Sequence, residues 1–452
     1  MLKTSGKDLA ILIALGLLQT IAIVYIAHYL IELIIVCTNM FYHGRWSVGD
    51  GVPDPHKIGW ISIFVPVVGG IIVGLMARYG SAGIRGHGIP EAMESILIKE
   101  SRIPKRLTIL KPISSAIAIG SGGPFGAEGP IIATGGALGS LIGQVVPVPE
   151  SSRKLLLACG AAAGMTAIFG TPMSAVLLAV ELLLFEFRAM SFIPVAVCAA
   201  FANILRYSLF GMDKPFFEMA TFTPPPTYEG YFVFLAFGAV LGIISVFVIK
   251  SVYWVEDAFE KLPIPWMFWP AIGGLAVGVI GWYEPRSLGV GYNNITDALM
   301  NNMTIELAAS LLLFKFLSWA IALGSGTSGG TLAPLMTLGA SLGLMTSAAL
   351  SYFAPEIPIA PQVMALAGMA GLFAGCSRAV LASVLFAFEA TRQPLGIVPL
   401  LGTCSMAYLF SRAFCEDSIM TLKIVRRGVH VPHEYMPVRP ATPPPVVEHS
   451  HH

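Results

Sequence analysis

The feature that most constrains the fold is a succession of apolar segments of uneven length, many of them broken by glycine or proline. The first, residues 9–37, would span about 43 Å as a helix, whereas residues 379–390 are too short to cross about 30 Å of hydrocarbon. Non-helical backbone at membrane depth is tolerated only inside protein or beside water. The pattern therefore predicts an all-α, multi-pass membrane protein built around an internal pathway.

Composition excludes most other classes of protein. Hydrophobic residues make up 55% of the 452 residues and charged residues only 12%, whereas soluble domains carry about 25% charged residues. A net charge of +1 offers no field that would attract nucleic acid. The six cysteines lack a C-x-x-C spacing, so neither a disulfide framework nor a zinc site is expected. No H-E-x-x-H or comparable cluster is present, so we expect no enzyme, metal or cofactor.

A polar stretch with three successive prolines, at 224–226, divides the chain near its middle. We expect a first transmembrane half at 1–210, a linker at 211–229, a second half at 230–428 and a disordered tail at 429–452. Lys3 and Lys7 precede the first apolar segment, which favours a cytoplasmic N-terminus. We expect both termini in the cytoplasm and the body in the inner membrane of the cell.

The two halves resemble each other. Residues 160–181 align with residues 368–389 at a constant offset of 208 without a gap, and Glu181 pairs with Glu389 at the end of an otherwise uncharged run. Internal repeats with helices broken at matching places indicate a transport site at the repeat interface.

Each half also contains a glycine-rich interruption before an apolar run: GSGGPFGAEGP at 120–130 and GSGTSGGTLAP at 324–334. Unpaired amides at a helix N-terminus carry partial positive charge, and glycine lets an ion approach the backbone closely. Glycine can also serve tight helix packing in lipid. Because both halves contain such a loop, we favour an anion site.

Glu128 lies inside the first interruption. A carboxylate at membrane depth costs several kcal/mol unless it is satisfied, and this one can dock on the amides that would hold a free anion. It would then compete with the permeant ion, and protonation would release it. The alternative is a helix-terminal carboxylate that only complements the dipole.

These residues resemble the CLC chloride channels and proton-coupled chloride antiporters. The resemblance covers about residues 58–428 and rests on the repeat and four ordered motifs: GHGIPE at 86–91, GAEGP at 126–130, GGTLAP at 329–334 and DSIMTLKIVRRG at 417–428. It implies two inverted-topology halves with up to eighteen tilted, partly half-spanning helices, and a homodimer with one pore per subunit. The chain ends soon after residue 428, so we expect no cytosolic CBS pair.

The resemblance assigns roles residue by residue. Glu128 matches the external gating glutamate, and His87, 41 residues earlier, falls where the family has its central serine. Ser121, in a similar GSGGP stretch, does not take that place. The implied anion-binding positions are His87, Gly88, Ile89, Gly126, Ala127, Gly129, Gly330, Thr331, Leu332 and Met420.

Three departures from the family matter. Met420 stands where a tyrosine usually touches the central ion, and Leu182 stands where many antiporters have a proton-relay glutamate. We hypothesise that His87 binds the anion and adds pH dependence, because a neutral imidazole donates one N–H and a protonated one is a cation. The alternative is that His87 turns away and bonds to nearby backbone.

We therefore expect anion transport, with chloride as the substrate, gated by a protonatable glutamate and coupled to proton exchange. A passive voltage-gated or pH-gated chloride channel and a secondary transporter of small organic anions remain alternatives. The expected partners are a second copy of the chain, the lipid bilayer, chloride and protons.

Overall fold

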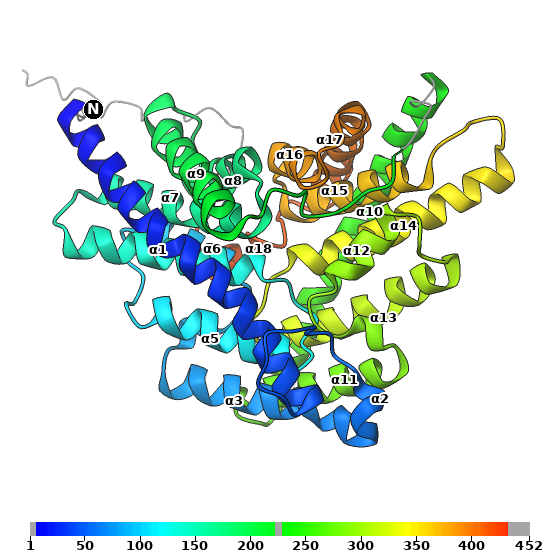
Figure 1. Ribbon diagram of the computed structural model, residues 1–452, viewed down its shortest axis with the longest axis horizontal. Coiled ribbons are helices and arrows are strands. Elements are labelled where there is room, and N and C mark those ends of the chain that lie inside the picture. Colours follow the sequence, from blue (N-terminus) through cyan, green and yellow to red (C-terminus); the bar gives the residue numbers. More distant parts are fainter. Residues whose placement is uncertain (1–5, 222–227, 433–452) are drawn as a thin grey trace, which may run out of the picture.

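The computed structural model describes residues 6–221 and 228–432, which form a body made entirely of helices and loops (Figure 1). The α-helices of the first half of the chain are α1 (Gly6–Thr38), α2 (Pro55–Ile58), α3 (Val65–Tyr79), α4 (Ile89–Ile98), α5 (Leu107–Gly120), α6 (Glu128–Val145), α7 (Glu150–Phe169), α8 (Pro172–Leu178) and α9 (Ala189–Phe210). Those of the second half are α10 (Tyr228–Glu260), α11 (Trp269–Tyr283), α12 (Tyr292–Leu299), α13 (Ile305–Gly324), α14 (Leu332–Phe353), α15 (Pro361–Ser377), α16 (Val380–Thr391), α17 (Ile397–Phe414) and α18 (Leu422–Arg426).

Short 3₁₀ or π turns extend or connect several of these helices. They are η1 (Asn39–His43), η2 (Gly59–Phe64), η3 (Ala82–Ile84), η4 (Ala179–Leu184), η5 (Trp266–Phe268), η6 (Pro285–Ser287) and η7 (Pro394–Gly396).

Helix lengths are as uneven as the sequence predicts. Within the described residues, eight helical runs are long and apolar enough to cross a membrane, the first of them Asp8–His43. Shorter apolar helices lie between them, such as Leu107–Gly120 and Val380–Thr391. Prolines in the first turn start α3, α4, α8, α11 and α15, where the missing N–H costs no helical bond.

The predicted repeat is visible in matched contacts between the two halves. The carboxylate of Glu181 accepts hydrogen bonds from the amides of Leu381 and Ala382, the second and third residues of α16, both at 3.1 Å. Glu389, 208 residues later, accepts from the second and third residues of α8, at 3.0 and 2.8 Å. Each half therefore caps a short helix of the other.

A second matched contact joins α3 to α11. A Cβ added at Gly70 would collide with the carbonyl of Pro270, and one added at Gly274 would collide with that of Pro66. The backbones therefore approach closely at glycine, as helices in lipid commonly do. The domain boundaries stay a prediction, and parts of the expected linker (222–227) and tail (433–452) lie outside the described residues.

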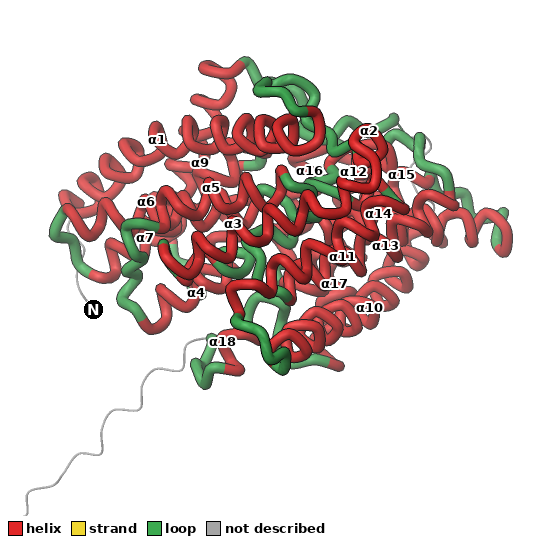
Figure 2. Tube along the Cα trace, turned by 90° about the horizontal axis from the view of Figure 1, so that it is seen from below, coloured by secondary structure: helices red, strands yellow, loops and turns green. Residues whose placement is uncertain are grey.

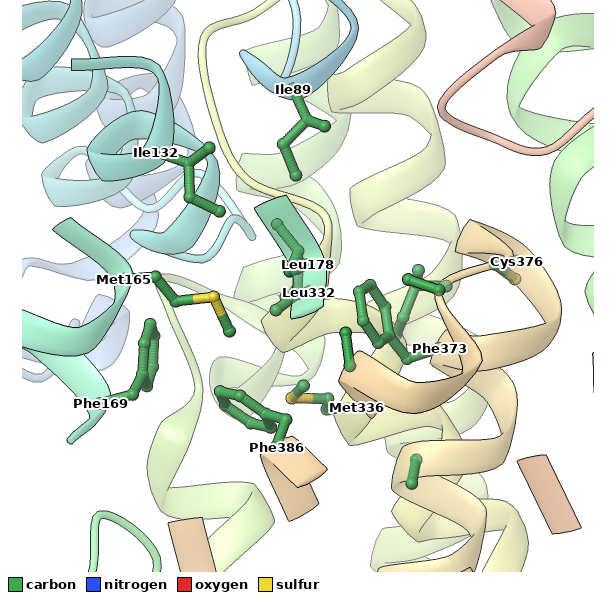
Figure 3. Packing of buried hydrophobic residues seen from close by; sticks show 14 of the residues in the cluster. Ile89, Ile132, Met165, Phe169, Leu178, Leu332, Met336, Phe373, Cys376 and Phe386 are labelled. Atoms are coloured by element: carbon green, nitrogen blue, oxygen red, sulfur yellow. The ribbon is translucent and has the colours of Figure 1, made fainter. Parts of the chain in front are cut away.

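Both halves contribute to one buried cluster. Figure 3 shows side chains of the first half (Ile132, Met165, Phe169 and Leu178) packed among side chains of the second half (Leu332, Met336, Phe373 and Phe386). At one edge of the molecule α18 lies beside α4 (Figure 2). The first residues of α4, α6 and α14 are all buried in the interior of the molecule.

Candidate functional site

The two glycine-rich loops meet in the interior through their backbones. The amide of Gly126 donates to the carbonyl of Gly330 at 3.3 Å, and the amide of Gly330 donates back to Gly126 at 3.0 Å. Two residues after each of these glycines a helix begins, α6 at Glu128 and α14 at Leu332. The helix N-termini of the two halves therefore converge at this pair.

A third loop, the one before α4, completes the arrangement. Gly86 forms a β-bridge with Ser328, and a Cβ added at Gly129 would collide with the carbonyl of His87. Gly88 has a φ of +92°, a backbone conformation that suits glycine. We call the three segments 86–89, 126–129 and 328–332 the loop junction.

The Glu128 side chain folds back over the loop junction. The residue is fully buried, and a Cβ added at Gly330 would lie 3.1 Å from its Oε2 atom. Oε1 accepts a hydrogen bond of 2.9 Å from the hydroxyl of Tyr292, whereas Oε2 has no hydrogen-bond partner among the described residues. The sequence placed Glu128 in a loop, but it is the first residue of α6, with Ala127 as its N-cap.

Three buried polar side-chain atoms at the loop junction lack hydrogen bonds: Oε2 of Glu128, Nδ1 of His87 and Oγ1 of Thr331. Each of these residues is at most 6% exposed. Buried polar atoms are nearly always paired in folded proteins, and exceptions need an explanation such as a ligand. The His87 ring forms no hydrogen bond to any other described residue, so the bond to nearby backbone that we considered as an alternative is absent.

Among the positions that the resemblance implies for the anion, Gly88, Ile89, Thr331 and Leu332 would contribute backbone amides, and three of these four amides remain available. The N–H groups of Ile89, Thr331 and Leu332 form no hydrogen bond within the described residues. The amide of Gly88, in contrast, donates to Oε2 of Glu91 at 2.7 Å. Glu91 therefore caps the first turn of its own helix.

Two further residues discussed in the sequence analysis are Met420, a predicted anion-binding position, and Ser121, which was excluded from the site. Met420 is fully buried and belongs to the same apolar cluster as Ile89 and Leu332, with its amide donating to the Ser418 hydroxyl at 3.2 Å. The Ser121 hydroxyl donates to the carbonyl of Ala118 at 3.1 Å and faces α3, where a Cβ added at Gly69 would collide with it. Its exclusion from the candidate anion site agrees with this geometry.

A cavity of about 500 Å³ reaches the loop junction from the side of α4 and α18. Gly88 and Glu91 line its inner end, but Glu128 does not contribute to it. Its walls are densely charged and carry both signs: Arg85, Lys99, Lys111, Lys423 and Arg427 together with Glu91, Glu94, Glu256 and Glu260. This cavity could not be predicted from the sequence, because its charged residues come from segments far apart in the chain.

Several of these charges are paired. Lys423 contacts Glu256 at 3.0 Å, and Arg427 contacts Glu94 at 2.7 Å. The ammonium of Lys111 donates to the carbonyls of Ile84 and Gly86 at 2.7 and 2.8 Å. Lys111 thereby fixes the loop that precedes His87.

Sequence reasoning missed Tyr292, the only described side chain that forms a hydrogen bond with Glu128. It follows Gly291 as the first residue of α12. The only signal in the sequence is an aromatic residue placed directly after a glycine at a helix start, a pattern too common to single it out.

The chain is similar to known transport proteins over most of its length. Residues 69–412 match the model of a family described as "Voltage gated chloride channel". A putative chloride channel protein, ClcB-like, from Ralstonia nicotianae is 28% identical over 375 residues, which are 81% of this chain and 86% of that protein. The H⁺/Cl⁻ exchange transporter ClcA of Vibrio vulnificus is 32% identical over 358 residues, 76% of this chain and 74% of the relative.

Solved structures share the fold. A slow cyanobacterial Cl⁻/H⁺ antiporter superposes with a TM-score of 0.80 at 22% identity, covering 93% of this chain and 97% of that one. A CLC-type fluoride/proton antiporter superposes with a TM-score of 0.76 at 22% identity, covering 92% and 98%. The predicted all-helical CLC fold is thus confirmed. By its matching family model and its relatives, the chain belongs to the voltage-gated chloride channel family.

Proposed function

We propose that this protein carries chloride across a membrane in exchange for protons and that Glu128 is its gate. The observation that carries the proposal is the position of the Glu128 carboxyl group. It is fully buried over the paired glycine loops, beside two converging helix N-termini, with one oxygen unpaired. A tethered carboxylate in that place occupies space that a small anion can take.

The loop junction suits an anion that must leave again. The unpaired amides of Ile89, Thr331 and Leu332 offer partial positive charge at two helix starts. Such dipoles attract a halide without the strong hold of a buried ammonium or guanidinium group. The buried ammonium of Lys111, beside the segment that precedes His87, already donates to two carbonyls.

Proton exchange follows from the same competition. An ionised Glu128 is attracted to the helix starts, and a protonated one loses most of that attraction. Chloride then takes its place, and each replacement of the ion by the carboxylate returns a proton. We favour exchange over a passive channel because the ClcA relative is named an H⁺/Cl⁻ exchanger. Leu182 is buried and apolar, so another group must receive the proton on the far side.

Flux through proteoliposomes tests the proposal. With a chloride gradient as the sole driving force, the wild-type protein should pump protons against their own gradient. Glu128→Gln should lose the proton movement and keep chloride flux. Glu306→Gln is the matched control, because Glu306 is exposed in the first turn of α13. No chloride flux in the wild type, or full proton pumping by Glu128→Gln, would contradict the proposal.

Selectivity and assembly belong to the same proposal. We expect chloride to be the transported anion, and competition by fluoride and nitrate in the same vesicles measures how selective the site is. We also expect a homodimer, detectable by cross-linking in native membranes, and an inner-membrane location with both termini cytoplasmic. Labelling of single cysteines introduced near each end, with an impermeant reagent, would locate the termini.

A further inference from the structure

We propose that Tyr292 is a latch: its hydroxyl holds the Glu128 carboxylate in the closed position and thereby sets the pH at which the gate opens. This inference rests on the proposed role of Glu128. Tyr292 is a positioning residue in this account, since it acts through the carboxylate and not on the ion.

The first argument is the hydrogen bond itself. The phenol oxygen lies 2.9 Å from Oε1 of Glu128, and the backbone amide of Ala127 faces the same phenol oxygen. Glu128 is fully buried, whereas Tyr292 is half-buried. The phenol therefore contacts the carboxyl group at the start of α6 from α12, an element of the other half of the chain.

The second argument is that the ring is held from several directions. Phe169 of α7 meets it edge-on at 6.0 Å and 89°, and Phe216 does so at 5.1 Å and 85°. Phe217 lies 6.0 Å away, and its amide is tied to the carbonyl of Ala390 at 2.9 Å. Phe386, labelled with Phe169 in Figure 3, packs 5.3 Å from the Phe169 ring.

Such edge-to-face contacts hold aromatic rings in defined orientations. We call these four phenylalanines and Tyr292 the aromatic collar. Its members come from α7, the segment before α10, α12 and α16, so the phenol is positioned by both halves of the protein.

The third argument is that the start of α12 is itself pinned. The ammonium of Lys315, a buried residue of α13, donates to the carbonyls of Ser287 and Gly289 at 3.0 and 2.7 Å. The side-chain amide of Asn294 donates to the carbonyl of Arg286 at 2.9 Å. The loop that delivers Tyr292 is therefore rigid, and a gate that moves must move away from the phenol.

The charged groups on the surrounding elements are already engaged. Arg286 pairs with Asp297 of α12 at 2.7 Å, and Glu389 of α16 is bound by amides of α8. Lys315 faces carbonyl groups. Among the described residues, Tyr292 is thus the titratable side chain that bonds directly to the gate.

The hydrogen bond from Tyr292 changes the pH at which Glu128 is released in a definite direction. A phenol donates a stronger hydrogen bond to an ionised carboxylate than to a neutral acid, so the latch favours the ionised, closed gate. A more acidic solution is then needed to protonate and release Glu128. Removing the hydroxyl should allow release at a higher pH.

The experiment measures chloride efflux from proteoliposomes between pH 4.5 and 8. Tyr292→Phe should move the pH of half-maximal flux upward by about one to two units, the size expected for one hydrogen bond to a charged group. 3-Fluorotyrosine at position 292, a more acidic phenol that donates more strongly, should move it downward. The control is Tyr42→Phe, which also removes one hydroxyl, bonded at 3.1 Å to the carbonyl of Ser121, and should leave the profile in place.

A double variant tests whether the effect of Tyr292 on the pH profile acts through Glu128. In a Glu128→Gln background, Tyr292→Phe should no longer shift the profile. The latch is refuted if the Tyr292→Phe profile overlays that of the wild type, or if the same shift persists without Glu128. Failure of the proposed function has a different signature, namely proton pumping that survives Glu128→Gln. Gel filtration in detergent checks that every variant folds.

Discussion

At the scale of single residues, the loop junction depends on positions that have no side chain. A Cβ on Gly330 would lie 2.5 Å from the carbonyl of Gly126 and 3.1 Å from Oε2 of Glu128. Gly330→Ala should therefore part the loops and reduce chloride flux at least tenfold, since overpacking of this kind costs about 1–3 kcal/mol. Gly49→Ala is the control, because a Cβ at Gly49 meets nothing within 4 Å. Equal flux in the two variants would contradict the close-approach argument.

His87 gives a second test at this scale. Its ring is buried, which opposes protonation, and Nδ1 is unpaired, so we expect His87→Ala to weaken anion binding by a similar factor from pH 5 to 8, through the loss of one neutral N–H donor. Isothermal titration with chloride from pH 5 to 8 measures the effect. An affinity that is unchanged at every pH would remove His87 from the site.

The roles of individual residues could be predicted where their spacing in the sequence, or a repeat, distinguished them from their neighbours. Glu128 stood out because it breaks an uncharged, glycine-rich stretch, and His87 because of its distance from Glu128 in the family pattern. Tyr292 could not be found in this way, since its hydrogen bond to Glu128 joins residues 164 positions apart. The contact of Glu91 with the Gly88 amide is the one expected of an acidic residue at the third position of a helix, which reaches back to the N-cap amide.

At the scale of elements, the reciprocal caps of α8 and α16 make a stability prediction. Glu389→Ala removes the carboxylate that accepts from two amides of α8 and should lower the free energy of unfolding by about 1–2 kcal/mol, the usual cost of a lost helix cap. Thermal unfolding in detergent measures it. Glu306→Ala, an exposed first-turn change in α13, should have a much smaller effect, and similar losses in both would argue against the caps.

The elements themselves were largely predictable. Apolar segments bounded by glycine and proline gave the positions of the short helices, because proline starts a helix easily and cannot continue one. The π turn at Ala179–Leu184 was not predictable, as it arises where Glu181 reaches across to α16. The charged cavity was not predictable either, since its lining comes from helices far apart in the chain, among them α4, α5, α10 and α18.

At the scale of the whole molecule, the contact of α3 with α11 should be intolerant of any side chain. Gly70→Ala places a methyl group against the carbonyl of Pro270 and should lower the midpoint of thermal unfolding by several degrees, from about 1–3 kcal/mol of overpacking. In the control, Gly402→Ala, the nearest atom is the end of the flexible Leu235 side chain at 3.0 Å. If Gly402→Ala destabilises as much as Gly70→Ala, close backbone contact is not the cause.

The helical membrane architecture followed from the apolar segments and the two related halves from the repeat with its offset of 208, whereas the CLC fold was implied by the resemblance of four ordered motifs. The two glycine-rich loops predicted an anion site to which both halves contribute, and the backbone pairing of Gly126 with Gly330 brings these loops into contact. Contacts that depend on packing between the halves, such as the aromatic collar, needed the structure.

The crossed carboxylate caps have a consequence for how the protein is made. A nascent chain that has been synthesised only to residue 210 contains Glu181 without the amides of α16, and its α8 lacks Glu389. Each half therefore lacks the carboxylate that caps one of its short helices. During biogenesis in the bilayer, the first half must remain without this cap until the second half has been synthesised and inserted. Two separately translated fragments, split near residue 220 and expressed together, should therefore rescue each other's yield, whereas either fragment alone should be degraded.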